Sequence, residues 1–592
     1  MNTIPQRLQI LRNEMRKAGV AACIIPGTDP HASEYIADFW KEREWISGFD
    51  GSAGTAVVTT CEAGLWTDSR YFLQGSEQLK GTGFELMKMG LPETPDMLSW
   101  LAQVLKPGEK VAVNPQMFSL NAFASMEKEL TMNGLQLVSA DLMATAWTDR
   151  SPLPVDPFFV FSAEKAGRSC KEKIQLVRAE MQKAHADVFV MSALDDIAWL
   201  FNIRGRDVAY NPVVIAYALI DTKNTILYID EVKLTPETSA YLAGEQVIVK
   251  PYLSIYEDLK NIGLQNKVLV DGAKLNQSLF EAIPKSCTKI NQMSPVFKLK
   301  AIKNEVELAG IRKAMLKDGV ALTRFFIWFE NNINSGELSE VSIAEKLAQF
   351  RADQGDFFGE SFCTIAGFAG HGAIVHYRAD ETSDSKLTPD NILLLDSGGQ
   401  YLQGTTDITR TLTLGKTTSQ QKTDNTLVLK GHIGIATAKF PVGTRGSQLD
   451  ILARKAMWDL GINYGHGTGH GIGHFLNVHE GPQNIRMDEN PTTLQPGMII
   501  SNEPGLYRAN QYGIRIENLV RVRESVTTEF GQFLEFETLT LFPIDKNLID
   551  KAMLSQQELD WFNAYHQEVY DKIAPLLSPE EQRWLSEKTS AL

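Results

Sequence analysis

Residues that could do chemistry gather in one stretch of this 592-residue chain. Seven of its ten histidines lie between residues 371 and 479. They are His371, His376, His432, His466, His470, His474 and His479. Imidazole binds metals and transfers protons near neutral pH, so this concentration among glycines and carboxylates indicates a metal or catalytic site. Chance placement in solvated loops would explain one or two histidines, but not seven.

The densest part is YGHGTGHGIGH, with glycine at every second position from 465 to 473. This pattern excludes a helix, although His466 and His470 have the i, i+4 spacing of a helical zinc site. In an extended chain the two side chains point the same way but stand ~13 Å apart. We therefore expect one histidine to bind metal and another to do something else. A glycine-rich turn whose histidines cap backbone groups is the alternative.

Two acids lie in a predicted hairpin, NILLLDSGGQYLQGTTDITRTLTL. Asp396 and Asp407 are equally far from its midpoint at residues 401 and 402, so a turn there would bring them face to face. A turn at residues 398 and 399 would offset them. Aspartate packs poorly in apolar strands and is costly to bury, so the pair requires a counter-charge. Exposure at the two strand ends is the alternative.

A second predicted hairpin, GMIISNEPGLYRANQYGIRIENLVRV, places Glu503 and Glu517 symmetrically about Asn510. Arg515 could pair with one acid, but a single guanidinium cannot balance four buried carboxylates. Oxygen-rich ligation with one imidazole favours Mn²⁺, Co²⁺ or Zn²⁺, and a bridging carboxylate would hold two ions ~3.5–4 Å apart. The pattern therefore predicts a dinuclear centre.

The elements that must position these groups follow an α/β pattern. The first ~150 residues alternate helical stretches with short β-rich runs, and the pattern restarts after the proline-rich residues 151–159. A long amphipathic helix is expected over residues 305–331. Two capping boxes, Ser555 with Glu558 and Ser578 with Glu581, predict helices at the end of the chain. The predicted domains are residues 1–152, 153–300 and 301–540, followed by a helical extension, 541–592.

Composition excludes several classes of protein. With 72 acids and 58 bases the formal charge is −14, which disfavours nucleic acid and anionic lipid surfaces. The longest apolar run, residues 213–220, is far shorter than the ~20 residues of a membrane helix. The N-terminus lacks the pattern of a secretory signal, and five scattered cysteines fit neither a disulfide framework nor a zinc knuckle. We expect a cytoplasmic protein that neither spans a membrane nor binds nucleic acid.

These segments together resemble the pita-bread metallopeptidases, the family of methionine aminopeptidase, prolidase and aminopeptidase P. SEYIADFWKEREWISGFDGSAGTAVVT, GLWTDSRYFLQ, LDDIAWLFNIRGRDVAYNPV and HGTGHGIGHFLNVHEGP are similar to the three-domain cytosolic aminopeptidase P group of that family. The resemblance covers essentially the whole chain. It implies two tandem creatinase-like α/β domains, then a pita-bread catalytic domain with a helical C-terminal extension.

The resemblance also implies a metal site. Five residues match the family's ligands in order: Asp396, Asp407, His470, Glu503 and Glu517. They would hold two divalent ions, of which Mn²⁺ is favoured and Zn²⁺ and Co²⁺ are alternatives. Glu503 would also take a proton from the attacking water and return it to the leaving nitrogen.

Further residues gain roles by resemblance alone. His466 and His479 would hydrogen-bond the developing oxyanion or the substrate backbone, and His376 would lie near the proline site. Arg515 would steady Asp407 or the substrate. Arg70, in TDSRYF, would reach the substrate across a dimer interface. His371 and His474 receive no role.

The resulting expectation is a Mn²⁺-dependent, homodimeric Xaa-Pro aminopeptidase that acts on peptides with proline in second position. An Xaa-Pro bond lacks the N–H through which other peptidases grip an extended backbone, and its ring fixes φ. Prolidase-like hydrolysis of Xaa-Pro dipeptides is the nearest alternative, which the extra leading domain disfavours. A catalytically inactive peptide- or histone-binding module on the same fold is the alternative from another class.

Overall fold

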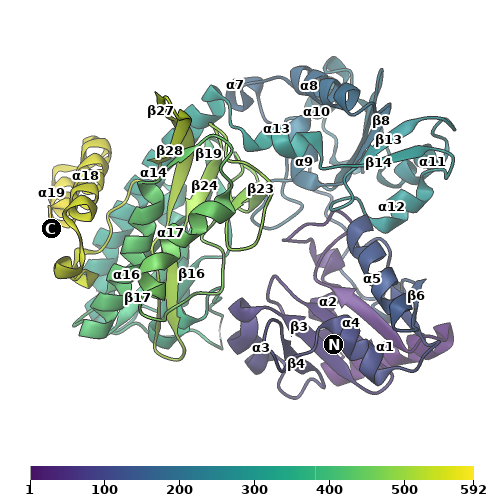
Figure 1. Cartoon of the computed structure of the whole chain (residues 1–592), viewed down its shortest axis with the longest axis horizontal. Helices are drawn as coiled ribbons and strands as arrows, with labels where there is room; N and C mark the ends of the chain where they lie inside the picture. Colours follow the sequence, from purple (N-terminus) through teal and green to yellow (C-terminus); the bar gives the residue numbers. More distant parts are fainter. Residues whose placement is uncertain (1, 381) are drawn as a thin grey trace. The chain divides into compact units, whose positions relative to one another are not determined.

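The computed structural model describes residues 2–380 and 382–592 of the chain (Figure 1). The chain folds into two compact units. Unit 1 comprises Met1–Ala163 and Arg168–Lys298, and unit 2 comprises Glu164–Gly167 and Leu299–Leu592. Helices and strands alternate through both units, as the sequence predicts. Within the described ranges, no helix combines the length and the apolarity that crossing a membrane requires.

Unit 1 contains two six-stranded sheets with the same topology. Their strand orders are β4-β3-β2-β1-β5-β6 and β12-β11-β10-β8-β13-β14. In the first sheet, β1 pairs antiparallel with β2 and parallel with β5. In the second sheet, β8 likewise pairs antiparallel with β10 and parallel with β13. This repeated plan confirms the two tandem α/β folds that the sequence predicts.

The bounds of the unit 1 elements follow the apolar runs. The strands are β1 (Ala22–Pro26), β2 (Thr55–Thr59), β3 (Ala63–Thr67), β4 (Glu85–Lys88), β5 (Lys110–Val113), β6 (Gln136–Ser139), β7 (Phe159–Val160), β8 (Val188–Met191), β9 (Ile203–Arg204), β10 (Ala216–Asp221), β11 (Thr225–Ile229), β12 (Ile248–Lys250), β13 (Lys267–Val270) and β14 (Thr288–Asn291). The helices are α1 (Ile4–Ala18), α2 (Glu42–Ser47), α3 (Phe72–Gln78), α4 (Met97–Val104), α5 (Leu120–Met132), α6 (Met143–Ala146), α8 (Cys170–Lys183), α9 (Leu194–Leu200), α10 (Pro236–Gly244), α11 (Ile255–Lys260) and α12 (Gln277–Ala282). The short helices α7 (Ala163–Ala166) and α13 (Pro295–Ala301) lie where the chain passes between the units.

Unit 2 contains the histidine-rich stretch, which contributes strands to several of its sheets. Their orders are β21-β28-β27-β24-β22-β23, β16-β17-β20, β15-β18-β19 and β25-β26. The strands are β15 (Phe357–Glu360), β16 (Ile365–Phe368), β17 (Ile392–Ser397), β18 (Gly399–Tyr401), β19 (Gly404–Thr405), β20 (Ile408–Thr413), β21 (Lys439–Pro441), β22 (Gly469–Gly471), β23 (Glu480–Ile485), β24 (Ile499–Asn502), β25 (Gly505–Arg508), β26 (Tyr512–Arg515), β27 (Asn518–Thr528) and β28 (Gly531–Thr538). The longer helices are α14 (Glu305–Asn332), α15 (Glu340–Ala352), α16 (Ser419–Ala436), α17 (Gly446–Trp458), α18 (Gln556–Ile573) and α19 (Pro579–Thr589).

The register of the first acidic hairpin differs from the prediction. β17 pairs with β20 so that Asp396 lies opposite Thr409, and Tyr401 pairs with Gly404 at the tip. The turn therefore centres one position later than expected, and Asp407 precedes β20 instead of facing Asp396. The register is the same on both sides of Gly398, since Ser397 pairs with Ile408 and Gln400 pairs with Thr405. A two-residue turn at Leu402 and Gln403 therefore sets the shift, and Gly404, with a φ of +157° that favours glycine, follows it.

The second hairpin has the predicted register. Gly505 pairs with Arg515, and Asn502 pairs with Asn518, so the axis of symmetry passes through Asn510. Asn510 adopts a φ of +59°, a conformation that asparagine tolerates better than most residues. Glu503 and Glu517 therefore occupy matching positions on neighbouring chain segments.

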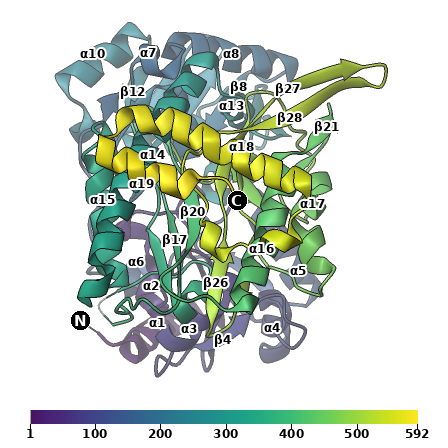
Figure 2. The same ribbon diagram turned by 90° about the vertical axis from the view of Figure 1, so that its left-hand side faces the viewer.

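The C-terminal helices confirm both predicted capping boxes, at Ser555 and at Ser578. In Figure 2, α18 and α19 lie side by side across the face of unit 2, where both pack on α14. Arg324 of α14 contacts Glu581 at 2.9 Å, which ties the last helix to the long helix beneath it.

Candidate metal centre

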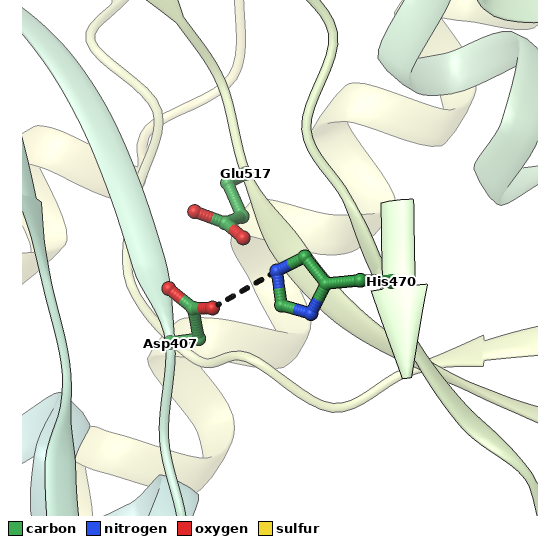
Figure 3. Close-up of side chains that lie close together, drawn as sticks. All are labelled: Asp407, His470 and Glu517. Atoms are coloured by element: carbon green, nitrogen blue, oxygen red, sulfur yellow. Dashed lines mark ion pairs between the residues drawn. The ribbon is translucent and has the colours of Figure 1, made fainter. Parts of the chain in front are cut away.

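Three of the five candidate ligands converge on one point. Asp407 precedes β20, His470 lies in β22, and Glu517 joins β26 to β27. One ligand atom from each lies within 4.8 Å of the others, and Figure 3 shows the three side chains pointing toward one another. His470 Nε2 stands 3.6 Å from Asp407 Oδ2. Three chain segments that are far apart in sequence thus offer donors to one position.

The other two candidate ligands adjoin this group. Glu503 Oε1 lies 3.5 Å from His470 Nε2. Asp396 Oδ2 accepts a hydrogen bond of 2.6 Å from Arg515 Nη2. Its second oxygen, Oδ1, is buried and has no hydrogen-bond partner among the described residues. Asp396 also interacts electrostatically with Asp407, Glu503 and Glu517, so all five predicted ligands gather in one region of unit 2.

The electrostatics of this region favour added positive charge. Burial raises the pKa of Glu503 to about 7, against opposing attraction from Arg515. Burial, followed by repulsion from neighbouring acids, raises the pKa values of Asp407 and Glu517 well above their ordinary range. Four carboxylates and one imidazole form a donor set that fits divalent cations. Asp396 Oδ1, which lacks a hydrogen-bond donor, is one of the oxygens that a cation would satisfy.

Neighbouring hydroxyls and carbonyls orient the candidate ligands. His470 Nδ1 lies 3.0 Å from the Gly471 carbonyl, an arrangement that favours the proton on Nδ1 and directs Nε2 toward the candidate carboxylates. Thr409 Oγ1 donates to Glu517 Oε2 at 2.7 Å, and Ser501 Oγ donates to Glu503 Oε1 at 3.2 Å. Thr409 and Ser501 were not predicted, because a hydroxyl within a strand carries no distinctive pattern.

Two of the predicted catalytic histidines adjoin the ligands. The His479 ring lies 4.3 Å from the His470 ring in an edge-to-face arrangement. His466 Nε2 is 2.8 Å from the Tyr507 hydroxyl, which also accepts a hydrogen bond from Arg515 at 2.6 Å. Tyr507 is a site residue that sequence reasoning missed, because tyrosine is common in ordinary strands.

The chain next to His376 is bound to the same region. The Val375 carbonyl accepts a hydrogen bond of 3.3 Å from Arg515 Nη2. Arg515 itself pairs with Asp396, whereas the sequence suggested Asp407 or the substrate as its partner. One guanidinium therefore joins a candidate ligand, Tyr507 and the loop that carries His376.

A buried ion pair on α17 holds the glycine-rich loop. Asp450 and Arg454 are one helical turn apart and pair with each other. Arg454 donates to the carbonyls of Tyr464 (2.7 Å) and His466 (2.9 Å), and Asp450 Oδ1 accepts from Thr468 Oγ1 at 2.6 Å. We call these two residues the α17 clamp. Their i, i+4 spacing of an acid and a base is the signal that could have found them.

The remaining singled-out residues have partners of their own. Arg70 belongs to unit 1, where its Nε and Nη2 each donate to Asp68 at 2.7 Å. His371 Nδ1 lies 3.0 Å from Glu340, and His474 Nε2 lies 2.9 Å from the Gln403 carbonyl. His371 and His474 thus hold loops of unit 2.

Comparison with known proteins places this centre in a family. Residues 309–524 match the model of "Metallopeptidase family M24", and residues 532–592 match its C-terminal region. Residues 7–146 and 149–307 each match a "Creatinase/Prolidase N-terminal domain". A Laccaria bicolor protein named "Probable Xaa-Pro aminopeptidase P" is 42% identical over 99% of this chain and 93% of its own length. The chain belongs to metallopeptidase family M24.

Further relatives of this M24 chain agree. A Neosartorya fischeri protein with the same name is 43% identical over 99% of this chain and 92% of its own length. The solved X-prolyl aminopeptidase of Caenorhabditis elegans, described as a cytosolic enzyme with a di-nuclear active site, has a TM-score of 0.95, 35% identity and full coverage of both chains. The Xaa-Pro dipeptidase of Bacillus anthracis, at 24% identity and a TM-score of 0.52, covers 64% of this chain and 99% of its own, and shares the fold. The tandem α/β and pita-bread architecture predicted from sequence is confirmed.

Proposed function

We propose that this M24 peptidase is a dinuclear Xaa-Pro aminopeptidase, which removes the N-terminal residue from peptides with proline in second position. The observation that carries the proposal is the convergence of Asp407, His470 and Glu517 with two further acids. That convergence occurs in a chain whose full-length relatives are named Xaa-Pro aminopeptidase P.

The cofactor belongs to the same proposal. Two divalent cations would be held by Asp396, Asp407, His470, Glu503 and Glu517. Mn²⁺ is the proposed native ion, because oxygen-rich ligation suits it, and Zn²⁺ and Co²⁺ are the alternatives. When bound, the cations would lower the pKa of a shared water and polarise the scissile carbonyl.

The chain's own residues would move the protons. Glu503, whose Oε1 lies 3.5 Å from His470 Nε2, would take a proton from the attacking water and pass it to the leaving nitrogen. His479, beside His470, would donate a hydrogen bond to the developing oxyanion. His466 would exchange its bond to Tyr507 for one to the substrate backbone.

Recognition of proline requires shape more than hydrogen bonds, since the Xaa-Pro bond offers no N–H. We assign His376 to the proline side of the site, on the loop that Arg515 holds at Val375. Arg70 is proposed to reach the substrate from the partner subunit of a homodimer. A cytoplasmic location is proposed by analogy with the C. elegans enzyme, which is described as cytosolic.

Substrate length separates this function from prolidase activity. We expect hydrolysis of Xaa-Pro-Xaa peptides to be faster than that of Xaa-Pro dipeptides, measured as kcat/KM on matched pairs. Activity confined to dipeptides would overturn the aminopeptidase assignment. Metal analysis, with rates before and after chelation, tests the cofactor, and a metal-free, inactive preparation would favour the binding module.

A further inference from the structure

Unit 1 contains a cavity of about 200 Å³ that the proposed peptidase reaction does not use. It lies beyond the carboxyl ends of β1, β5 and β13, lined by residues that include Thr28, Gln116 and Asn276. β1 and β5 are parallel neighbours from which the sheet continues in opposite directions. In open α/β sheets such a switch point is where ligands bind.

The walls of this cavity are tied together by backbone hydrogen bonds. Leu120 N donates to the Leu275 carbonyl, and Gln277 N donates to the Phe118 carbonyl, each at 2.9 Å. Asn276 Nδ2 donates to the Pro30 carbonyl at 2.8 Å. The loops after β1, β5 and β13 therefore form one fixed enclosure.

Asp29 presents an unsatisfied acceptor in this enclosure. Its Oδ1 accepts hydrogen bonds from His31 N at 2.9 Å and from Ser33 N at 3.0 Å. Its Oδ2 is buried and has no hydrogen-bond partner among the described residues. Asp29 is only 1% exposed and is one of the residues that line the cavity. A buried carboxylate oxygen without a donor is costly, so a ligand that supplies a charged N–H would be stabilised here.

Lys274 is the only other charged residue among those that line the cavity. Its ammonium lies 5.4 Å from the centre of the Phe297 ring. One acid and one base favour a ligand that carries both signs and has no net charge. A simple cation or anion would leave one of the two protein charges unbalanced.

The rest of the lining is largely apolar. Met117, Phe118, Ala122 and Ala273 contribute to it. A cavity of about 150 Å³ admits a six-carbon ring, so this volume suits a molecule of similar size. We propose that the cavity binds a free α-amino acid with a small apolar side chain, its ammonium on Asp29 and its carboxylate toward Lys274. The inference does not depend on the reaction at the metal centre.

Calorimetric titration of the full-length protein with L-valine and L-proline tests this inference. We expect saturable binding, weakened roughly tenfold or more in Asp29→Asn and in Lys274→Met, because each variant loses an interaction with a charged group. Ala122→Leu, which fills the cavity, should also abolish binding. L-Valinamide and N-acetyl-L-valine, which each lack one charge, should bind at least tenfold more weakly than L-valine.

Matched controls separate this site from the metal centre and from misfolding. Asp38→Asn removes an exposed acid of the same unit and should leave binding unchanged. Thermal unfolding of each variant shows whether the fold is retained, and Lys274→Met keeps the test valid if Asp29→Asn does not fold. Absence of saturable binding by the natural chain, or binding that all three variants leave unchanged, would overturn the inference. Because titration does not read hydrolysis, it is independent of the proposed function.

Discussion

At the scale of single residues, the candidate centre is defined by an imbalance of charge. Four acids share the positive charge of Arg515, and the guanidinium forms its ion pair with Asp396. Such a cluster is unfavourable by itself, since burial and mutual repulsion both oppose ionisation. The same imbalance makes the group a strong ligand set, because bound dications would supply the positive charge that the four acids lack.

Glu503 is the residue on which the proposed proton transfer depends. Glu503→Gln should lower kcat roughly 10²-fold or more, the scale of a lost general base, while the fold is retained. The measurement is kcat on an Xaa-Pro-Xaa peptide, with circular dichroism to check the fold. Glu524→Gln, at an exposed position of β27, is the matched control. A Glu503→Gln variant with natural rates would remove this residue from the mechanism.

At the scale of elements, rigid parts of unit 2 hold the glycine-rich loop in place. Glycine alone cannot fix the positions of His466 and His470. The α17 clamp binds two carbonyls and one hydroxyl of residues 464–468. A helix thus supplies the order that the loop sequence lacks.

Breaking the α17 clamp should therefore impair catalysis without removing a reacting group. Arg454→Met is expected to lower kcat roughly 10- to 100-fold, because small misplacements of catalytic groups carry costs of that size. Lys455→Met, which breaks only an exposed ion pair on the same helix, should have little effect. Steady-state kinetics of both variants decide the point, and equal rates would show that the clamp does not position the loop.

The C-terminal helix α18 carries a histidine that makes stability depend on pH. His566 is buried and accepts a hydrogen bond from Ile544 N at 3.1 Å. Burial lowers its pKa from 6.5 to about 3. Below pH 6.5 the unfolded chain takes up a proton that the folded chain does not. The free energy of unfolding should therefore fall as pH decreases from about 6.5 toward 3, by up to about 1.4 kcal/mol per pH unit.

Urea unfolding at a series of pH values measures this slope. His566→Gln keeps an acceptor for Ile544 and should show a smaller loss of stability in acid than the natural chain. His185→Asn changes an exposed histidine and should leave the slope as it is. Identical slopes in all three proteins would exclude His566 as the source of acid sensitivity.

At the scale of the whole molecule, unit 1 has a proposed role in the chemistry of unit 2. Its two repeated α/β folds come before the candidate metal centre in the chain. Arg70 of unit 1 is proposed to reach a substrate bound in the partner subunit. Its pairing with Asp68, through two hydrogen bonds of 2.7 Å, holds the guanidinium in a defined orientation.

Mixed dimers test the contribution of Arg70 across subunits. Arg70→Ala and Glu503→Gln subunits should each be poorly active alone. In a mixed dimer, the subunit that retains Glu503 would receive Arg70 from its partner, so one site is complete. Activity measured after co-refolding or co-expression should recover toward half the natural value. No recovery in a preparation shown to contain mixed dimers would contradict a role across the interface.

The sequence alone determined the features that depend on local order along the chain. Residue types and spacing identified the four candidate acids, the helix starts at Ser555 and Ser578, and the hairpin symmetrical about Asn510, and the family resemblance singled out His470 among the histidines. Caps, turns and alternation act over a few residues, so a single sequence reveals them. Asp396, Asp407 and Glu503 stood out because acids are unusual within apolar strands.

Tertiary structure decided what depends on which segments meet. A turn at Leu402 and Gln403 placed the axis of the first hairpin one residue later than its sequence symmetry predicted. Tyr507, the α17 clamp and the orphaned oxygen of Asp29 acquired their importance only through neighbours distant in sequence. Such contacts arise from long-range packing and burial, and the type and spacing of nearby residues do not encode them.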